Sequence, residues 1–357
     1  MKLFTNSVWV IVTVLFTLNL SVAEAVTTNS ATIEACALLP DTTSSSRYEK
    51  FDQPLLAKAF MAADISAEIY NAQGDPQTQL SQARECLNNG AKVILLDALD
   101  QDSGKAITTV AVDSGAKVVD YDRLTVDSEA LYYVSFDSYK VGVLLGMGLV
   151  KALKESRMYW KTPVIAVLNG AITDNNAKLF KEGYDAILGP LFDAGTFKKA
   201  SDEDQWTDWD PQTALTIFEQ MLILNNNHID GVLAANDNLA VSVVSAIKNN
   251  ELHRFALTGQ DATELGVQFI LSGRLSGTVY KSIQSEAVAA VKVVSDIING
   301  NKVVTNGMVS GIPAVLLDST WITKKNYTML FSDGFLNKVD VCTDKYAKYC
   351  KKKNNSN

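Results

Sequence analysis

The chain contains few of the residues from which catalytic and metal centres are usually built. Only two histidines, His228 and His253, occur in 357 residues, which excludes a histidine-rich metal site and disfavours a Ser-His-Asp triad. There is no CxxC pair, so zinc or redox chemistry is not indicated. No GxSxG, P-loop or GxGxxG motif follows an expected strand. We therefore expect no cofactor, no metal and no catalytic residue.

Basic residues are outnumbered by acidic ones. Lys and Arg number 32 against 40 Asp and Glu, and the resulting net charge of −8 argues against a nucleic-acid-binding surface. Hydrophobic residues make up 47% of the chain and charged residues 20%, as in a soluble globular protein. A length of 357 residues is large for a single core, so we expect two domains.

The N-terminus has the pattern of an export signal. Lys2 precedes an apolar run from Val8 to Leu20, and Ala23–Ala25 forms a small-x-small cleavage site. The run is short for a membrane span, and no cysteine follows it that would indicate a lipoprotein anchor. We expect a signal peptide over residues 1–25 and an exported chain, periplasmic or extracellular. Attachment to the cell surface and an uncleaved signal anchor stay open.

Four cysteines lie in the expected mature chain, where an oxidising compartment would allow disulfides. Cys342 and Cys350 are close together in a polar tail, so this pair is the favoured bridge. Cys36 lies in an expected strand and Cys86 on an expected helix face. For these two, a second bridge and two buried free thiols are equally consistent with the sequence.

Short apolar runs alternate with helical patterns along most of the chain. Such runs are typical of strands buried on both faces, and the alternation predicts an α/β fold with parallel sheets. The expected strands are Cys36–Leu39, Ala67–Tyr70, Lys92–Leu96, Lys117–Tyr121, Val164–Leu168, Gly231–Ala235 and Ala256–Thr258. We expect two sheets that change over at Tyr133–Asp137, an interrupting loop at Ser201–Asp210, and a tail without helix or strand at Asp340–Asn357.

Polar side chains collect where the expected strands end, which is where open α/β sheets bind ligands. After the strand at Val164–Leu168, Asp174 offers a carboxylate beside the amides of Asn175 and Asn176. Another strand ends in Asn236 and Asp237. Carboxylates and amides suit sugar hydroxyls, whereas phosphate prefers glycine-rich backbone with Lys or Arg. Nearby Trp and Tyr side chains suit the apolar faces of a pyranose ring.

Two other interpretations of these residues are possible. A carboxylate pair could hydrolyse a glycoside, but most of these acids stand beside Arg, Lys or an amide, and such neighbours keep a carboxylate ionised. Each Asp could also simply cap the helix that follows its strand. The recurrence of an acid with an amide or base at many strand ends favours a binding site.

Seven motifs in one order resemble the type I periplasmic sugar-binding proteins of ABC importers, and among them the D-xylose-binding proteins. The motifs are TyrAspArg at 121–123, ValSerPheAsp with LysValGly within 134–142, AspAsnAsnAlaLysLeuPhe at 174–180, AspGlnTrp at 204–206, AlaAsnAsp at 235–237, GlyGlnAspAla at 259–262 and ThrValTyrLys at 278–281. The resemblance covers about residues 36–330. The Cys-bearing tail is an addition to the family pattern.

The resemblance implies two Rossmann-like domains joined by a three-segment hinge, with a sugar in the cleft. The first domain would comprise residues 32–137 and 282–311, the second residues 138–281 and 312–335, and residues 336–357 would form a polar tail. The implied sugar-binding residues are Arg47, Tyr48, Asp122, Arg123, Asp174, Asn176, Trp209, Asn236, Asp261 and Lys281. Trp209 is chosen over Trp206 as the stacking residue although its loop is one residue shorter than in similar proteins.

The function expected from the residues and the resemblance is capture of an aldopyranose, xylose or a glucose-like sugar, for an ABC importer. The partners would be a monosaccharide and permease subunits, and the protein would be a monomer. A sugar sensor for a chemoreceptor or signalling partner is an alternative, and a sugar-acting enzyme is a weaker one. A sugar-responsive repressor would need an N-terminal helix-turn-helix, where this chain has an export signal.

Overall fold

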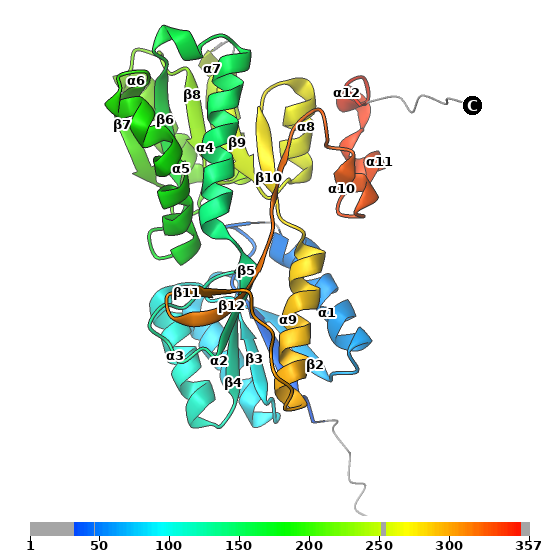
Figure 1. Ribbon diagram of the computed structural model, residues 1–357. Coiled ribbons are helices and arrows are strands. Elements are labelled where there is room, and N and C mark those ends of the chain that lie inside the picture. The colour runs from blue at the N-terminus through cyan, green and yellow to red at the C-terminus, as the bar shows by residue number, and fades with distance from the viewer. Residues whose placement is uncertain (1–31, 46, 251–254, 351–357) are drawn as a thin grey trace, which may run out of the picture. The chain divides into compact units, whose positions relative to one another are not determined.

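The computed structural model describes residues 32–45, 47–250 and 255–350, so the predicted signal peptide lies outside the described residues. The chain forms two β-sheets, and each sheet has helices on both faces (Figure 1). The α/β fold with two mostly parallel sheets is as predicted. None of the helices in the described ranges is long and apolar enough to cross a membrane.

The first sheet has seven strands in the order β11-β12-β5-β4-β3-β1-β2, all parallel except the β11–β12 pair. Its strands are β1 (Ala35–Leu39), β2 (Ala67–Asn71), β3 (Val93–Leu96), β4 (Lys117–Tyr121), β5 (Tyr132–Phe136), β11 (Gly307–Val309) and β12 (Ile312–Leu317). The helices α1 (Gln53–Ala62), α2 (Pro76–Asn88), α3 (Gln101–Asp113) and α9 (Ile283–Ile298) cover it. We call this part, with the short π-helix η1 (Tyr48–Asp52), the first lobe.

The second sheet has six strands in the order β13-β10-β9-β8-β6-β7, all parallel except the β10–β13 pair. Its strands are β6 (Val164–Asn169), β7 (Lys198–Trp206), β8 (Gly231–Ala234), β9 (Ala256–Gln260), β10 (Gly277–Tyr280) and β13 (Thr320–Ile322). Its helices are α4 (Ser138–Glu155), η2 (Tyr159–Lys161), α5 (Asn175–Asp193), α6 (Pro211–Leu224), α7 (Asp237–Asn250) and α8 (Glu264–Ser272). These elements form the second lobe, together with α10 (Met329–Ser332), α11 (Lys338–Val341) and α12 (Asp344–Ala347), because α11 and α12 contact α8.

The central strands are apolar along their whole length because helices cover both faces of each sheet. All residues of β1, β3 and β8 are buried. In the first lobe α1 and α9 pack on one face and α2 and α3 on the other. In the second lobe α4 and α5 approach closely at a glycine, since a Cβ on Gly142 would lie 2.0 Å from the carbonyl oxygen of Phe180.

Side-chain caps start the helices directly after strand ends. Asp100 and Ser103 form a capping box on α3, and Asp137, Asp210 and Thr263 accept hydrogen bonds from the first turns of α4, α6 and α8. These caps fix where each strand-to-helix loop ends. They therefore also fix the position of the polar residues within those loops.

The chain passes between the two sheets three times: between β5 and α4, between β10 and α9, and between β12 and β13. The predicted third boundary at 311–312 is wrong, since Ala314 to Leu317 pair with β5 in the first sheet. The third crossing therefore falls between Leu317 and Thr320. The apolar run of β12 would suit either sheet, and only its long-range pairing decides between them.

Two segments expected to lack secondary structure are in fact structured. Much of the predicted loop at Ser201–Asp210 belongs to β7, an edge strand with a register irregularity and mostly polar, partly exposed residues. Charged side chains are common on edge strands, and they hide the apolar pattern. The predicted tail contains α11 and α12, in which Val341 and Tyr346 are buried. Residues 351–357 lie outside the described residues.

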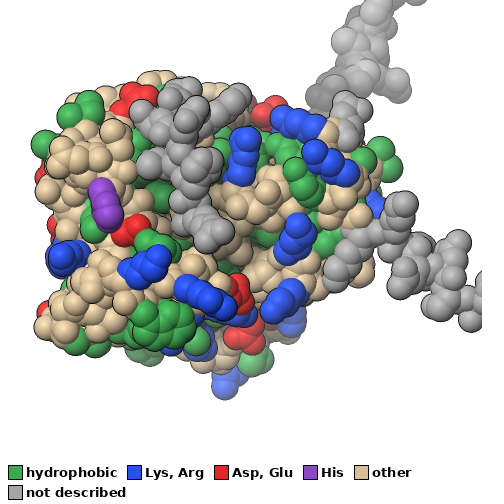
Figure 2. All heavy atoms as spheres, turned by 90° about the horizontal axis from the view of Figure 1, so that it is seen from above, with side chains coloured by type: hydrophobic (Ala, Val, Ile, Leu, Met, Phe, Trp, Pro, Cys, Tyr) green, Lys and Arg blue, Asp and Glu red, His purple; other side chains and the backbone are tan. Residues whose placement is uncertain are grey.

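Charge is unevenly spread on the described surface. Although the net charge is −8, the face in Figure 2 carries more Lys and Arg side chains than Asp and Glu. The absence of nucleic-acid binding, expected from net charge, stays a prediction.

Candidate functional site

One cavity lies where the carboxyl ends of strands from both sheets face each other. Fourteen residues line it: Ser44, Ser45, Arg47, Tyr48, Asp122, Arg123, Asp174, Asn176, Phe180, Trp209, Asn236, Gln260, Asp261 and Lys281. All ten side chains expected from the sequence are among them. The structure thus brings the expected residues together, while their role in binding a ligand stays a prediction.

Arg47 is the centre of a buried ion cluster in the first lobe. Its guanidinium donates to Asp52 through Nε and Nη2, to Asp122 through Nη1 at 2.8 Å, and to Glu286 through Nη2 at 2.6 Å. All four residues are at most 4% exposed. Three elements thus converge on one cation: η1, the end of β4, and α9.

The cluster sets the charge of the group that faces the cavity. Burial alone would raise the pKa of Asp122, but Arg47, Lys281 and Arg123 lower it below its usual value. Burial would lower the pKa of Arg47, but the carboxylates of Asp122, Asp52 and Glu286 raise it. Asp122 is therefore an ionised acceptor and Arg47 a permanent donor.

Tyr48 and Arg123 form a second group on the first-lobe side. The Tyr48 hydroxyl donates to Asp122 Oδ2 at 3.0 Å, and the Arg123 guanidinium carbon lies 5.6 Å from the Tyr48 ring centre. Arg123 Nη2 donates to the Ser44 hydroxyl at 3.0 Å, and its Nε lies 3.7 Å from the fully buried Asp97. These contacts hold Tyr48 and Arg123 against the wall of the cavity.

In the second lobe, Asp174 both caps a helix and faces the site. Its Oδ1 accepts from the backbone N–H of Asn176 at the start of α5, and its Oδ2 accepts from Trp209 Nε1 at 3.0 Å. Arg123 Nε of the first lobe is 3.6 Å from the same Oδ2. Trp209 packs edge-on against Phe180, with ring centres 6.4 Å apart. Asp174 therefore caps α5, as one interpretation of the sequence proposed, and it also lines the cavity.

Asn176 joins the two lobes directly. Its Nδ2 donates to the Asp122 carbonyl at 2.7 Å, and its Oδ1 accepts from the hydroxyls of Tyr133 and Ser138. Asp122 and Tyr133 belong to the first lobe, whereas Asn176 begins α5 of the second. Its amide is thus already engaged by protein atoms, so part of its role is to fix one lobe against the other.

The remaining expected residues come from the ends of β8, β9 and β10. Asn236 Nδ2 donates to the Ser44 carbonyl at 3.3 Å, and Asp261 Oδ2 accepts from the Ser45 hydroxyl at 3.4 Å. Lys281 Nζ lies 3.4 Å from Asp261 Oδ1, which has no hydrogen-bond partner among the described residues. Burial would lower the pKa of Lys281, but Asp122 and Asp261 raise it. The positively charged Lys281 side chain therefore lies where the chain crosses between the sheets for the second time, directly after β10.

Three residues of the cavity wall have a left-handed backbone. The φ angles are 58° at Asp122, 59° at Trp209 and 93° at Asp261. Residues with a Cβ rarely adopt this region, and such conformations persist only where surrounding contacts enforce them. Left-handed conformations are common at ligand sites. Here they occur in residues that follow strand ends and whose side chains line the cavity.

Sequence reasoning missed several contributors. Ser44, Ser45, Phe180 and Gln260 line the cavity but were not in the expected set, and Asp52 and Glu286 hold Arg47 from behind. One signal could have been found: Glu286 lies in the buried stripe of α9 with Ile283 and Ala290. An acid at a core position normally has a buried partner.

The arrangement is suited to holding an uncharged polar molecule. It combines fixed cations, carboxylates, amides and three aromatic side chains, Tyr48, Phe180 and Trp209, around one cavity. Charge-assisted hydrogen bonds from such groups are stronger than neutral ones. No cluster of three His, Cys, Asp or Glu side chains suited to a metal ion occurs in the described part of the chain.

The fold and the position of this cavity define a class of protein. The family model for the periplasmic binding protein domain matches residues 36–302, so the chain belongs to the periplasmic binding protein family. The D-xylose-binding periplasmic protein of Escherichia coli is 32% identical over 297 residues, covering 81% of this chain and 87% of that protein. The multiple sugar-binding periplasmic receptor ChvE of Rhizobium radiobacter is 29% identical, covering 80% and 86%.

A solved structure agrees with these relatives. A carbohydrate transporter solute-binding protein from Chloroflexus aurantiacus, in complex with D-glucose, superposes with a TM-score of 0.78 at 25% identity. It covers 86% of this chain and 98% of its own.

Proposed function

We propose that this protein is an exported solute-binding protein that captures an aldopyranose between its two lobes and delivers it to an ABC importer. The observation that carries the proposal is the convergence of Arg47, Asp122, Asp174, Asp261 and Lys281 on one interlobe cavity. Equatorial hydroxyls take in-plane hydrogen bonds from such groups, and Tyr48 and Trp209 supply apolar surface for the ring.

Xylose is the favoured sugar, with glucose as the second. The relative at 32% identity is named for D-xylose, and the superposed structure at 25% identity holds D-glucose. The two sugars differ by one hydroxymethyl group. The choice therefore depends on the space that the cavity wall leaves beside C5 of the ring.

Export is supported by more than the N-terminal sequence. All four cysteines are paired, as Cys36–Cys86 and Cys342–Cys350, which fits an oxidising compartment. The relatives cited above are named as periplasmic. We expect permease subunits of an importer as partners, and a monomer in solution.

The surroundings of Asp122 and Asp174 support binding without turnover. Asp122 is held ionised by Arg47 and Lys281, so it is an acceptor and not a general acid. Asp174 is committed to the Trp209 indole and to the first turn of α5. A role as a sugar receptor for a signalling partner is the second candidate, because the relative ChvE is named a receptor. It would use the same cavity.

Calorimetric titration of the mature protein with a panel of pentoses and hexoses tests the proposal. We expect dissociation constants in the micromolar range for D-xylose or D-glucose, which corresponds to about −8 kcal/mol. NMR of the mixture over hours should show the sugar unchanged. Failure of every sugar to bind would refute the proposed ligand class, and conversion of a bound sugar would refute the assignment as a binding protein.

A further inference from the structure

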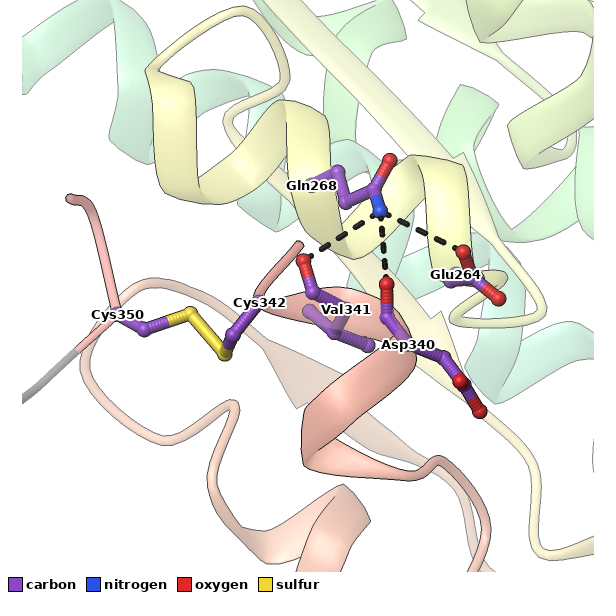
Figure 3. The surroundings of a disulfide bond; sticks show 6 residues. All are labelled: Glu264, Gln268, Asp340, Val341, Cys342 and Cys350. Carbon is purple, nitrogen blue, oxygen red and sulfur yellow. Dashed lines mark hydrogen bonds between the residues drawn. A yellow bond between two sulfur atoms is a disulfide. The ribbon is translucent and has the colours of Figure 1, made fainter. Parts of the chain in front are cut away.

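The C-terminal segment, residues 335–350, is attached to the second lobe. Figure 3 shows Gln268 of α8 beside the turn that ends α11: its Nε2 lies 3.3 Å from the Asp340 carbonyl and 3.4 Å from the Val341 carbonyl. Val341 is fully buried, and the Cys342–Cys350 disulfide closes the segment just beyond it. The segment is therefore fixed at a definite place on α8.

The same segment contacts the first lobe through one aromatic side chain. The Phe335 ring stacks on Phe51 of η1, with centres 4.5 Å apart and planes 23° apart, and it lies 4.9 Å from Tyr280 at the end of β10. Phe335 is 9% exposed. Phe51 and Leu55 of the first lobe pack against the hydrophobic core of the second lobe. An apolar contact thus joins the lobes beside the polar cavity.

The first-lobe side of this contact is the turn that builds the cavity wall. η1 carries Tyr48, which lines the cavity, and Asp52, which accepts two hydrogen bonds from Arg47. It has no side-chain cap, and π-helical turns are rare and occur frequently at functional sites. Phe335 packs on the side of η1 that bears Phe51.

We propose that Phe335 is a positioning residue for ligand binding: the C-terminal segment braces η1 across the lobes and thereby favours the closed arrangement. Phe51 and Phe335 belong to different lobes, so their contact stabilises the arrangement in which the lobes approach. A contact made in one of two states shifts the population toward that state. The inference rests on the proposed sugar binding, and it adds a residue outside the cavity to the determinants of affinity.

The test compares Phe335→Ala with a matched control, Phe331→Ala. Phe331 lies four residues earlier and packs edge-on against Tyr327 of the second lobe, with ring centres 5.7 Å apart. We expect Phe335→Ala to weaken binding of D-xylose or D-glucose about tenfold, mainly through faster release in stopped-flow measurements. Phe331→Ala should change the affinity less than about twofold, since its loss affects stability in both states alike.

Two further variants separate positioning from loss of fold. Phe51→Ala should reproduce the effect from the first lobe, and the double variant should be no weaker than either single variant, because both remove one contact. Hydrogen exchange of the amides at residues 48–52 should be faster in Phe335→Ala and unchanged in Phe331→Ala. If Phe335→Ala does not fold, Phe51→Ala carries the affinity test.

The outcomes distinguish the two proposals. A wild-type protein that binds no sugar of the panel refutes the proposed function. A wild type that binds sugar, with unchanged affinity and release in Phe335→Ala or Phe51→Ala, leaves the function standing and overturns the positioning role. Additive losses in the double variant would also overturn it.

Discussion

Asp261 is the side chain whose removal should weaken ligand binding most directly. It is buried, and its Oδ1 has no hydrogen-bond partner among the described residues. We expect Asp261→Ala to cost roughly 2–4 kcal/mol of binding, because Lys281 would lose its ion-pair partner and the sugar hydroxyls would lose an acceptor. Calorimetry gives the affinity, and a melting curve without sugar controls for folding. Unchanged affinity would refute the assignment.

Gly170 controls the position of the Trp209 indole. A Cβ at this residue would lie 2.1 Å from Trp209 Cζ2, so an alanine must displace the ring. We expect Gly170→Ala to break the hydrogen bond that the Trp209 indole donates to Asp174 and to shift the tryptophan fluorescence. We also expect it to weaken sugar binding at least about tenfold. Gly189→Ala is the control, since nothing lies within 4 Å of its Cβ position in α5. Equal affinities for the two variants would contradict this role.

The sequence predicted which residues line the cavity better than it predicted the hydrogen bonds and ion pairs between them. Asp174 and Asn236 follow strand ends, and that position is encoded locally by a strand, a polar loop and a cap. The contacts of Arg47 with Asp52 and Glu286 join segments 5 and 239 residues apart, and no local pattern specifies the longer one. Asn176 was expected to bind sugar, yet its amide also holds the lobes together.

At the scale of elements, an unbroken apolar sequence made several strands predictable. β1, β3 and β8 are apolar throughout because they are covered on both faces, and their sequences show it. β7 lies at an edge and is mostly polar, so its sequence resembles a loop. The helix α11 is four residues long, too short to show a period, and it depends on packing against α8.

The two disulfides should differ in their contribution to stability. Cys36–Cys86 spans 50 residues and joins β1 to α2, whereas Cys342–Cys350 spans 8. The chain-entropy model gives about 4 kcal/mol for the first loop and about 2.5 kcal/mol for the second. We therefore expect Cys36→Ala/Cys86→Ala to lower the free energy of unfolding more than Cys342→Ala/Cys350→Ala. Urea unfolding measures both, and the reverse order would contradict the expectation.

For the whole molecule, buried acids should make stability depend on pH. Burial raises the pKa of Asp120 to about 8 and that of Asp237 to about 7. The folded state thus keeps these protons while the unfolded chain loses them near pH 4. Their stabilising contribution is complete below about pH 4 and is lost as the pH rises through 7 to 8. Asp122 acts oppositely, because its lowered pKa contributes stability that is lost in acid.

Asp120→Asn isolates one of these groups. The amide mimics the protonated acid, which accepts a hydrogen bond from the Thr125 backbone N–H at 2.7 Å. We expect the wild-type free energy of unfolding to fall between pH 5.5 and 8.5, and the fall to be at least about 1 kcal/mol smaller in Asp120→Asn. Urea unfolding at the two pH values measures the difference. An identical fall in both proteins would show that Asp120 does not titrate in this range.

The last prediction concerns closure of the two lobes. Arg47, Asp122 and Arg123 come from the first lobe, and Asp174, Trp209 and Asn236 come from the second. Since neither lobe alone surrounds the cavity, a sugar should bind the closed arrangement better than the open one and shift the population toward closure. The closed form is then the shape that an importer could recognise as loaded.

Solution scattering and melting curves measure this closure. The sugar that the protein binds should lower the radius of gyration, and it should raise the melting temperature in proportion to the logarithm of its concentration once the site is saturated. Asp261→Ala, which we expect to bind the sugar more weakly, is the control, and its scattering curve should respond less to the same concentration. If a tightly bound sugar leaves the wild-type curve unchanged, the lobes do not close on it. The cavity would then be a preformed site, and loading would have to be signalled by something other than the approach of the lobes.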